Sequence, residues 1–277
     1  LVILAIFLCV AFYELLGICV AYKKQPEVSN TTKKETKNGS WNECSENTER
    51  AVIIEKNPEA LLQRVRLIKN AKKEIILSTF AFQSDESGKL ILGALHDAAD
   101  RGVHIRLLVD GMESWIDMEG NPYFYGLSSH ENVEIKLYNK ANPLKPWEMM
   151  GRMHDKYLIA DGKRYILGGR NTYNYFLGDF PGHKNYDRDV LVVCDEPEKE
   201  NSVNQLLEYF ETIWEQEDSG YFHDNKKLAN RKSVKNAVLE LQNGYQKYFE
   251  ENKERICDTD YTDETFETEK IALVSNP

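Results

Sequence analysis

The sequence feature that most constrains this chain is residues 153–171, which read MHDKYLIADGKRYILGGRN. Two short apolar runs, at residues 157–160 and 165–167, are separated by an Asp-Gly pair and followed by two glycines. Short apolar runs joined by Asp-Gly predict a β-hairpin. Because side chains alternate along a strand, we expect His154 and Lys156 on one face and Asp155 on the other. The hairpin therefore presents an imidazole and an ammonium group beside a glycine turn.

These groups are suited to the chemistry of phosphate esters. Lys156 supplies positive charge to phosphoryl oxygens, while Asn171 and the N–H of Gly169 add hydrogen-bond donors. His154 can attack phosphorus or move a proton near neutral pH. An isolated H-x-K pair is usually a solvated strand face, so the prediction depends on the whole pattern. That pattern is H-x-K-x4-D, completed by Asp161 and followed by G-G-x-N.

The complete pattern resembles the signature of the phospholipase D superfamily, and is most similar to the first half of bacterial cardiolipin synthases and related phospholipase D-like proteins. The similarity covers about residues 49–195. It implies that His154 is the nucleophile, forming a covalent phosphohistidine, and that Lys156, Gly169 and Asn171 bind the phosphoryl oxygens. It implies neither a metal nor a cofactor, and the sequence shows no cluster of metal ligands.

Two aspartates complete the set of candidate catalytic residues. Asp189 begins a predicted strand and is expected to hydrogen-bond the His154 imidazole and fix its tautomer. The alternative is a strand-edge acid paired with Arg188 or with solvent. Asp161 is expected to close the hairpin turn. In the segment HKNYDRD, where cardiolipin synthases often carry Trp-Arg-Asp, Asp187 takes the first position.

The resemblance also implies that the site has two halves, because each catalytic centre of the superfamily uses two facing H-x-K-x4-D motifs. This sequence contains one such motif. A second histidine should protonate the leaving alcohol, and no other histidine stands at H-x-K spacing; these are His96, His104, His130, His183 and His223. We expect the second motif beyond residue 277 of a longer chain, or from a homodimer partner.

Hydrophobic periodicity predicts an α/β fold with a mixed, largely parallel sheet flanked by helices. Residues 74–82, 87–101 and 103–110 read as strand, helix and strand, which is a βαβ unit. Further strands are expected at 133–138 and 189–194, with helices at 58–70 and 203–216. We interpret residues 49–216 as a phospholipase D-like catalytic half-domain, and 217–277 as a helical, acidic linker with the start of an incomplete second half-domain.

Residues 1–22 are apolar except for Glu14, and two lysines follow. This length is sufficient for one transmembrane helix. A cleavable signal peptide is the alternative, but no small-residue cleavage site follows, which favours an uncleaved anchor. Residues 23–48 read as a polar linker. The sequence thus predicts a single-pass, membrane-anchored protein with an extracytoplasmic catalytic part. Cys44 and Cys257 would form a disulfide there, or their placement is due to chance.

The net charge of −10 is unevenly distributed. Residues 140–190 hold nine basic and six acidic residues, whereas residues 194–277 hold ten basic and twenty acidic ones. A positive field around the motif fits an anionic substrate, but the total charge speaks against nucleic acid as a partner. Five aromatic residues are candidates either for a lipid-facing loop or for ordinary packing: Trp115, Tyr123, Phe124, Tyr125 and Trp147.

Three hypotheses for function remain. The first is a phosphodiesterase or phosphatidyltransferase that acts on membrane phospholipids, similar to cardiolipin synthase. The second is a metal-independent, nuclease-like phosphodiesterase that works as a homodimer, as in the nuclease branch of the superfamily. The third is a half-site that is inert until another part of the protein completes it.

Overall fold

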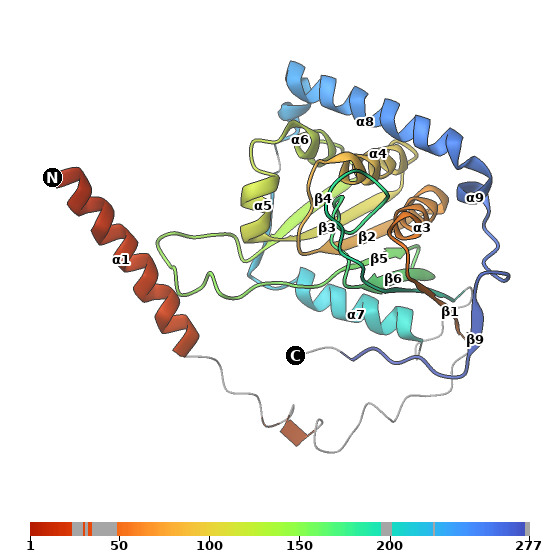
Figure 1. Ribbon diagram of the computed structural model, residues 1–277, viewed down its shortest axis with the longest axis horizontal. Helices are drawn as coiled ribbons and strands as arrows, with labels where there is room; N and C mark the ends of the chain where they lie inside the picture. The colour runs from red at the N-terminus through yellow and green to blue at the C-terminus, as the bar shows by residue number, and fades with distance from the viewer. Residues whose placement is uncertain (24–29, 31–32, 35–48, 195–200, 224, 275–277) are drawn as a thin grey trace.

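A computed structural model describes residues 1–23, 30, 33–34, 49–194, 201–223 and 225–274 (Figure 1). The helices are α1 (Val2–Lys23), α3 (Asn57–Asn70), α4 (Glu86–Asp100), α5 (Gly111–Asp117), α6 (Pro122–Ser128), α7 (Ser202–Trp214), η2 (Lys226–Asn230), α8 (Lys232–Glu251) and α9 (Lys253–Cys257). The strands are β1 (Glu49–Ile54), β2 (Glu74–Thr79), β3 (His104–Asp110), β4 (Val133–Tyr138), β5 (Tyr157–Ala160), β6 (Arg164–Gly168), β7 (Asp189–Val193), β8 (Ser219–Tyr221) and β9 (Phe266–Thr268).

The strands form one sheet in the order β8-β4-β3-β2-β5-β6-β7-β1-β9. This arrangement confirms the predicted α/β class and the mixed sheet. The expectation of a largely parallel sheet is wrong, because only β2, β3 and β4 pair in parallel and the remaining pairings in the described part of the chain are antiparallel. The βαβ unit accounts for the parallel part. Elsewhere, strands joined by short turns, such as β5 and β6, return antiparallel.

Helices cover both faces of the sheet (Figure 1). On one face, α3 and α4 pack on alternate strand residues that include Ile75 and Leu107, forming the larger core. On the other face, α7 packs on the intervening residues, including Ile76 and Leu108, through side chains such as Phe210. Continuous apolar runs such as β2 are explained by this burial on both faces.

The βαβ unit begins and ends as its sequence predicts. Asp85 caps α4, because its carboxylate accepts a hydrogen bond from the N–H of Gly88 at 3.0 Å. Gly102, with φ of +88°, then turns the chain from α4 into β3. The carboxyl ends of β2 and β3 therefore lie at one edge of the sheet, where Phe80 and Asp110 are found.

The described part of residues 217–274 packs on the same body as the rest. β8 pairs with β4, and β9 pairs with β1. The apolar face of α8 enters the larger core beside α4 through Val234, Leu241 and Tyr245. The division of the chain at residue 217 into a half-domain and a following linker stays a prediction.

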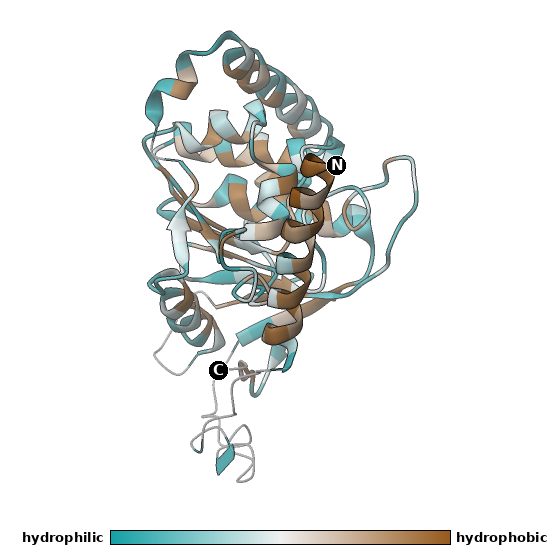
Figure 2. Ribbon diagram, turned by 90° about the vertical axis from the view of Figure 1, so that its left-hand side faces the viewer, coloured by the Kyte–Doolittle hydropathy of each residue, from teal (hydrophilic) through white to brown (hydrophobic). Residues whose placement is uncertain are grey.

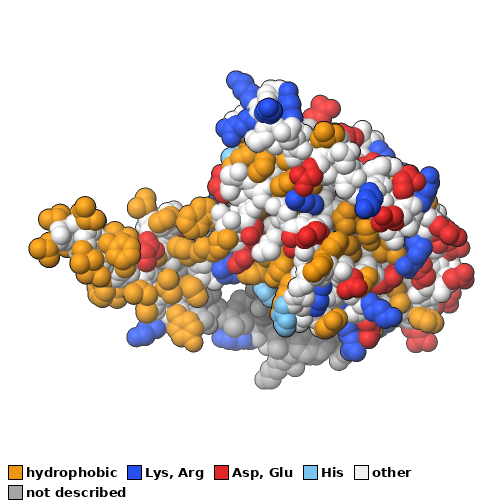
Figure 3. All heavy atoms as spheres, turned by 45° about the horizontal axis from the view of Figure 1, so that its top comes forward, with side chains coloured by type: hydrophobic (Ala, Val, Ile, Leu, Met, Phe, Trp, Pro, Cys, Tyr) orange, Lys and Arg blue, Asp and Glu red, His pale blue; other side chains and the backbone are white. Residues whose placement is uncertain are grey.

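α1 is long and apolar enough to cross a membrane. It projects from the body with apolar side chains along its length (Figures 2 and 3). Cys44 lies outside the described residues, and so does its possible pairing with Cys257.

Candidate active site

Three residues of the motif, His154, Lys156 and Asn171, meet at the edge where β2 ends and β5 begins. β2 and β5 are antiparallel, with Ser78 opposite Tyr157. Phe80, which follows β2, therefore lies beside His154, which precedes β5. A bridge between Phe82 and Thr172 brings the segment after β6 to the same edge. Sequence reasoning placed His154 on a strand, but β5 begins only at Tyr157.

His154 is the exposed member of the site. Its ring packs edge-to-face on the ring of Phe80, with centroids 4.7 Å apart. Partial burial and the neighbouring positive charge of Lys156 lower the pKa of His154 below its ordinary value, while the charges of Asp155 and Asp110 oppose this shift. A lowered pKa keeps the imidazole neutral near pH 7, which is the form that can act as a nucleophile.

Lys156 is buried behind His154, with 6% of its surface exposed. Its Nζ donates a hydrogen bond to the backbone oxygen of His154 at 2.6 Å and lies 5.3 Å from the centroid of the Phe80 ring. Burial lowers the pKa of Lys156 to about 8, against the opposing charges of Asp155 and Asp187. The ammonium group is therefore mostly charged at pH 7, close to the point at which it loses its proton.

Asn171 lies buried at the end of the hairpin, at 7% exposure. Its Oδ1 accepts a hydrogen bond from the N–H of Ala81 at 3.3 Å. This contact orients the side-chain amide, so that its nitrogen is the atom available to donate to an anion. Thr172 continues the connection, because its N–H donates to the backbone oxygen of Ala81.

The two glycines permit a close approach of two aspartates. A Cβ atom on Gly169 would stand 2.0 Å from Oδ2 of Asp187, and one on Gly168 would stand 2.1 Å from Oδ1 of Asp189. Any larger residue would displace these carboxylates. Asp187 thus lies against the glycine turn, and its negative charge raises the pKa of Lys156. Sequence reasoning gave Asp187 no role. The sequence feature that could have drawn attention to Asp187 is its place in the triplet Asp-Arg-Asp, where cardiolipin synthases often carry tryptophan.

Asp189 begins β7 as predicted, but its side chain contacts groups other than the His154 imidazole. Its side chain is fully buried and forms ion pairs with Arg64 at 2.9 Å and with Arg170 at 3.2 Å. Among the described residues, Oδ1 of Asp189 has no hydrogen-bond partner, and no hydrogen bond joins Asp189 to His154. The two buried guanidinium groups, which a one-dimensional pattern does not place, hold this carboxylate on the α3 side of β7.

Asp161 lies at the far end of β5 from His154. It adopts a φ of +54° in the turn between β5 and β6. Its carboxylate accepts hydrogen bonds from the N–H groups of Lys72, Lys73 and Glu74, at 2.7 to 3.1 Å. These contacts join the hairpin turn to the start of β2, so Asp161 supports the scaffold and does not reach the site.

Asp110, at the end of β3, holds the segment that leads into His154. Its buried carboxylate accepts hydrogen bonds from Nε of Arg152 at 2.9 Å and from the N–H of Met153 at 3.1 Å. Arg152 also lies over the Phe80 ring, at 5.1 Å from its centroid. Phe80, Asp110 and Arg152 are positioning residues that sequence reasoning did not identify.

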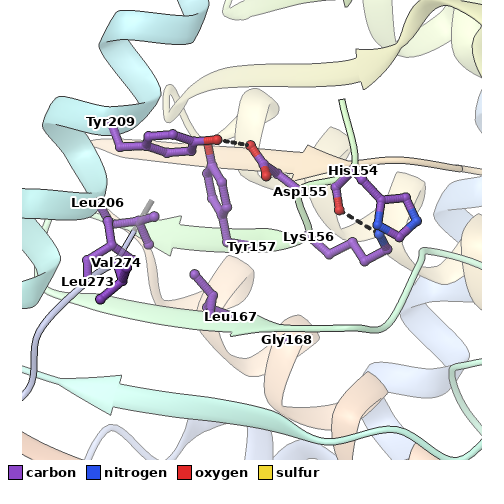
Figure 4. A pocket seen from close by; sticks show the side chains of 10 residues that line it. All are labelled: His154, Asp155, Lys156, Tyr157, Leu167, Gly168, Leu206, Tyr209, Leu273 and Val274. Carbon is purple, nitrogen blue, oxygen red and sulfur yellow. Dashed lines mark hydrogen bonds between the residues drawn. The ribbon is translucent and has the colours of Figure 1, made fainter. Parts of the chain in front are cut away.

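A cavity of about 240 Å³ extends from His154 and Lys156 toward α7 (Figure 4). Its apolar end is lined by Leu167, Leu206 and Leu273. The Asp155 side chain is directed away from His154 and accepts a hydrogen bond from the Tyr209 hydroxyl at 2.8 Å, in agreement with the predicted alternation (Figure 4).

The other histidines have partners of their own. Four of them lie beside carboxylates: His96, His104, His130 and His223. His96 and His130 share the carboxylate of Asp100. The His183 ring lies 5.6 Å from that of Tyr175. In the described ranges, no group of three or more His, Cys, Asp or Glu residues is arranged to hold a metal ion.

Sequence comparison identifies the family. Residues 64–214, more than half of the chain, match the family described as cardiolipin synthase, phospholipase D-like domain. The chain therefore belongs to this family, whose members are phosphodiesterases and phospholipid-modifying enzymes, and the resemblance seen in the motif is confirmed.

Two curated relatives show the range of similarity. An uncharacterized protein of Helicobacter pylori (strain J99) is 31% identical over 71% of this chain and 39% of its own length. Cardiolipin synthase C of Escherichia coli (strain K12) is 29% identical over 57% of this chain and 34% of its own length. The chain spans less than half the length of these curated relatives.

Among solved structures, phosphatidylserine synthase of Haemophilus influenzae is similar with a TM-score of 0.52 and 18% identity, over 80% of this chain and 48% of that one. This similarity supports the fold of the chain.

Proposed function

We propose that this chain carries one half of a phosphatidyl-transfer site that acts on membrane phospholipids through a covalent phosphohistidine at His154. The carrying observation is the placement of three groups at one edge of the sheet. An exposed imidazole, a buried ammonium and an oriented amide stand together at His154, Lys156 and Asn171. The cardiolipin synthase relatives support lipid as the substrate, and α1 supports a single-pass anchor. The extracytoplasmic side of the membrane is our proposed location for the catalytic part.

The proposed first step is an exchange of bonds at phosphorus. A nitrogen of the neutral His154 imidazole attacks, an N–P bond forms, and the P–O bond to the leaving alcohol breaks. Lys156 and Asn171 stabilise the charge on the non-bridging oxygens. The leaving alkoxide takes a proton from an acid, which we assign to a second H-x-K-x4-D motif in another part of the protein or in a second copy. A water or alcohol then gives its proton to the conjugate base of that acid, its oxygen forms a bond to phosphorus, and the N–P bond breaks to release the neutral imidazole.

The missing acid suggests a direct test of this half-site. The p-nitrophenyl group of a phosphodiester leaves as the stable p-nitrophenolate anion, so its departure needs little help from an acid. We expect the full chain to release p-nitrophenolate in a burst and to retain the phosphoryl group as an acid-labile adduct on His154, detected by mass spectrometry.

Two variants serve as controls for this experiment. His154→Ala should form no adduct, whereas His130→Ala, which changes a histidine paired with Asp100, should react as the wild type does. An adduct on another residue, or equal release by His154→Ala, would contradict the proposed nucleophile. Labelled phosphatidylglycerol in bilayers then tests the lipid substrate, with cardiolipin or phosphatidic acid as the expected product.

A nuclease-like phosphodiesterase is the second candidate, favoured by the single motif and by the exposure of His154 on an open face, which a second copy could cover. Cleavage of plasmid or single-stranded DNA without added metal, together with no turnover of lipid, would select this alternative. If only the p-nitrophenyl ester reacts, the chain alone is an incomplete half-site.

A further inference from the structure

Five apolar side chains stand exposed near the site, on a short helix and on a neighbouring loop. They belong to α5 and to the loop between β4 and β5, and we call them the apolar rim: Trp115, Ile116, Leu144, Trp147 and Met150, with exposures of 63, 69, 79, 44 and 48%. The other three candidates for a lipid-facing loop belong to the core instead, because Phe124 and Tyr125 are buried in it and Tyr123 packs against it, partly buried. Exposed apolar side chains gathered on one side commonly mark a binding surface.

Arg152 connects both segments of the apolar rim, α5 and the loop between β4 and β5, to the site. Its guanidinium forms ion pairs with Glu113 of α5 at 3.1 Å and with Asp110 at 2.8 Å. His154 follows two residues later. The apolar rim is therefore held in a fixed relation to the nucleophile.

α1 contacts this same loop. The Tyr13 hydroxyl donates a hydrogen bond to the backbone oxygen of Leu144 at 2.8 Å, and its ring packs edge-to-face on Trp147 at 6.5 Å. Gly17 leaves room for Pro146, since a Cβ there would stand 2.3 Å from the proline ring. Figure 1 shows the loop reaching from the body toward α1.

The depth of these contacts matches the boundary of a bilayer. Gly17 lies about 9 Å along the helix from Lys23, at about 1.5 Å per residue. Each headgroup layer is about 5–8 Å thick. With Lys23 in the outer part of that layer, the contact of Leu144 with Tyr13, about 15 Å along the helix from Lys23, lies inside the hydrocarbon. Pro146 and the backbone of Trp147, beside Gly17, lie where the headgroups meet the hydrocarbon. This is the depth at which tryptophan is enriched.

The backbone at the tip of the loop is suited to this environment. Besides the Tyr13 bond to the oxygen of Leu144, the N–H of Leu144 donates to Oδ1 of Asn142, and that of Lys145 donates to the oxygen of Asn142. Backbone groups that enter lipid need such partners.

We propose that the apolar rim inserts at the surface of the bilayer that α1 spans, so that the opening at His154 faces the phosphates of the lipid headgroups. The inference uses α1 as an anchor and does not depend on catalysis. Residues 111–117 and 140–152 together hold three basic and three acidic residues, so insertion is apolar in origin and insensitive to salt.

Fluorescence quenching of the full chain in liposomes that contain brominated lipids tests this proposal. In a Trp41→Phe background, three tryptophans remain: Trp115, Trp147 and the buried Trp214. We expect strong quenching with bromine near the headgroup end of the acyl chain, weaker quenching with bromine near its methyl end, and no change with added NaCl. Further replacement of Trp115 and Trp147 by Phe should abolish the quenching, leaving the emission of Trp214.

Two added tryptophans in that last background complete the test. Leu8→Trp, within α1, should be quenched, and Leu239→Trp, at an exposed position of α8, should not. The proposal is overturned if Trp115 and Trp147 are unquenched. Red-shifted emission would then mean that they face water, and blue-shifted emission that a protein partner covers them. Absence of quenching at Leu8→Trp would overturn it as well, because α1 would not be in the membrane.

Discussion

At the scale of single residues, the proposed mechanism places opposite requirements on the charges of two groups. His154 must be neutral to attack, and burial together with Lys156 lowers its pKa from the ordinary 6.5. Lys156 must be protonated to stabilise the phosphoryl oxygens, and its pKa is about 8. The influence runs in one direction, because the Lys156 charge lowers the pKa of His154, whereas the pKa of Lys156 is lowered by its burial and raised by Asp155 and Asp187.

A bell-shaped pH profile follows from these shifts. We expect the rate of adduct formation with the p-nitrophenyl ester to rise with pH below pH 6.5, as His154 loses its proton. The rate should fall again near pH 8, as Lys156 loses its proton. Lys156→Arg keeps its charge and should remove the alkaline limb, measured from the burst rate between pH 5 and 10 (roughly the range in which neither Asp nor Arg titrates). An alkaline limb unchanged in Lys156→Arg would contradict the role of Lys156.

Asp187 and Asp189 provide a matched pair of substitutions. Asp189→Asn leaves Arg64 and Arg170 buried without a counter-charge, so we expect a loss of about 3–5 kcal/mol in the free energy of unfolding. Asp187→Asn should change stability by no more than about 0.5 kcal/mol. It should instead move the alkaline limb to lower pH, since Asp187 raises the pKa of Lys156. Urea unfolding and the pH profile check both variants, and the reverse pattern would refute the assignment.

This pair also shows what the sequence can predict at the residue scale. The spacing of the motif was enough to select His154, Lys156 and Asn171, which the structure brings to one edge. It was not enough to predict the partners of Asp189, because one of them is Arg64, which comes from α3. Phe80 was visible only as one aromatic residue in the run TFAF, since contacts between distant segments have no local pattern.

At the scale of elements, the β5–β6 hairpin is fastened at both ends. Its glycine end carries the site, and its other end is bound to the start of β2 through Asp161. This division explains why one motif residue lies away from the chemistry. Periodicity predicted most helices and strands well, because burial on two faces imposes strong patterns. It failed on strand direction, which depends on neighbours that are remote in sequence, such as β2 and β5.

The Asp161 contacts lead to a prediction about stability. Asp161→Ala removes the acceptor of three N–H groups and places alanine, which has no polar side chain, at a positive φ. We therefore expect the free energy of unfolding to fall by about 1–3 kcal/mol. Asp161→Asn keeps an acceptor and tolerates this φ, and should lose less. Urea midpoints measure both, and adduct formation per folded molecule should stay at the wild-type level. A large loss of adduct in stable Asp161→Ala would show a catalytic role.

At the scale of the whole molecule, His154 lies on an open face and the chain holds one motif. Under the proposed mechanism, we therefore expect lipid turnover by this chain alone to require two copies. When wild-type chains are diluted with His154→Ala chains at constant total density in liposomes, turnover should fall with the square of the wild-type fraction. Release of p-nitrophenolate should fall only linearly. A linear fall for lipid would mean that one copy suffices.

The position of β1 has a consequence for how the chain is made. β1 lies between β7 and β9, with Arg50 opposite Val193 on one side and Glu267 on the other. Both neighbours are synthesised long after it, and at about 5–20 residues per second the delay is on the order of ten seconds or more. β1, the first strand of the described residues to leave the ribosome, thus waits unpaired until β7 has been synthesised. Until then its unpaired backbone is an open edge that is available for pairing with other nascent chains.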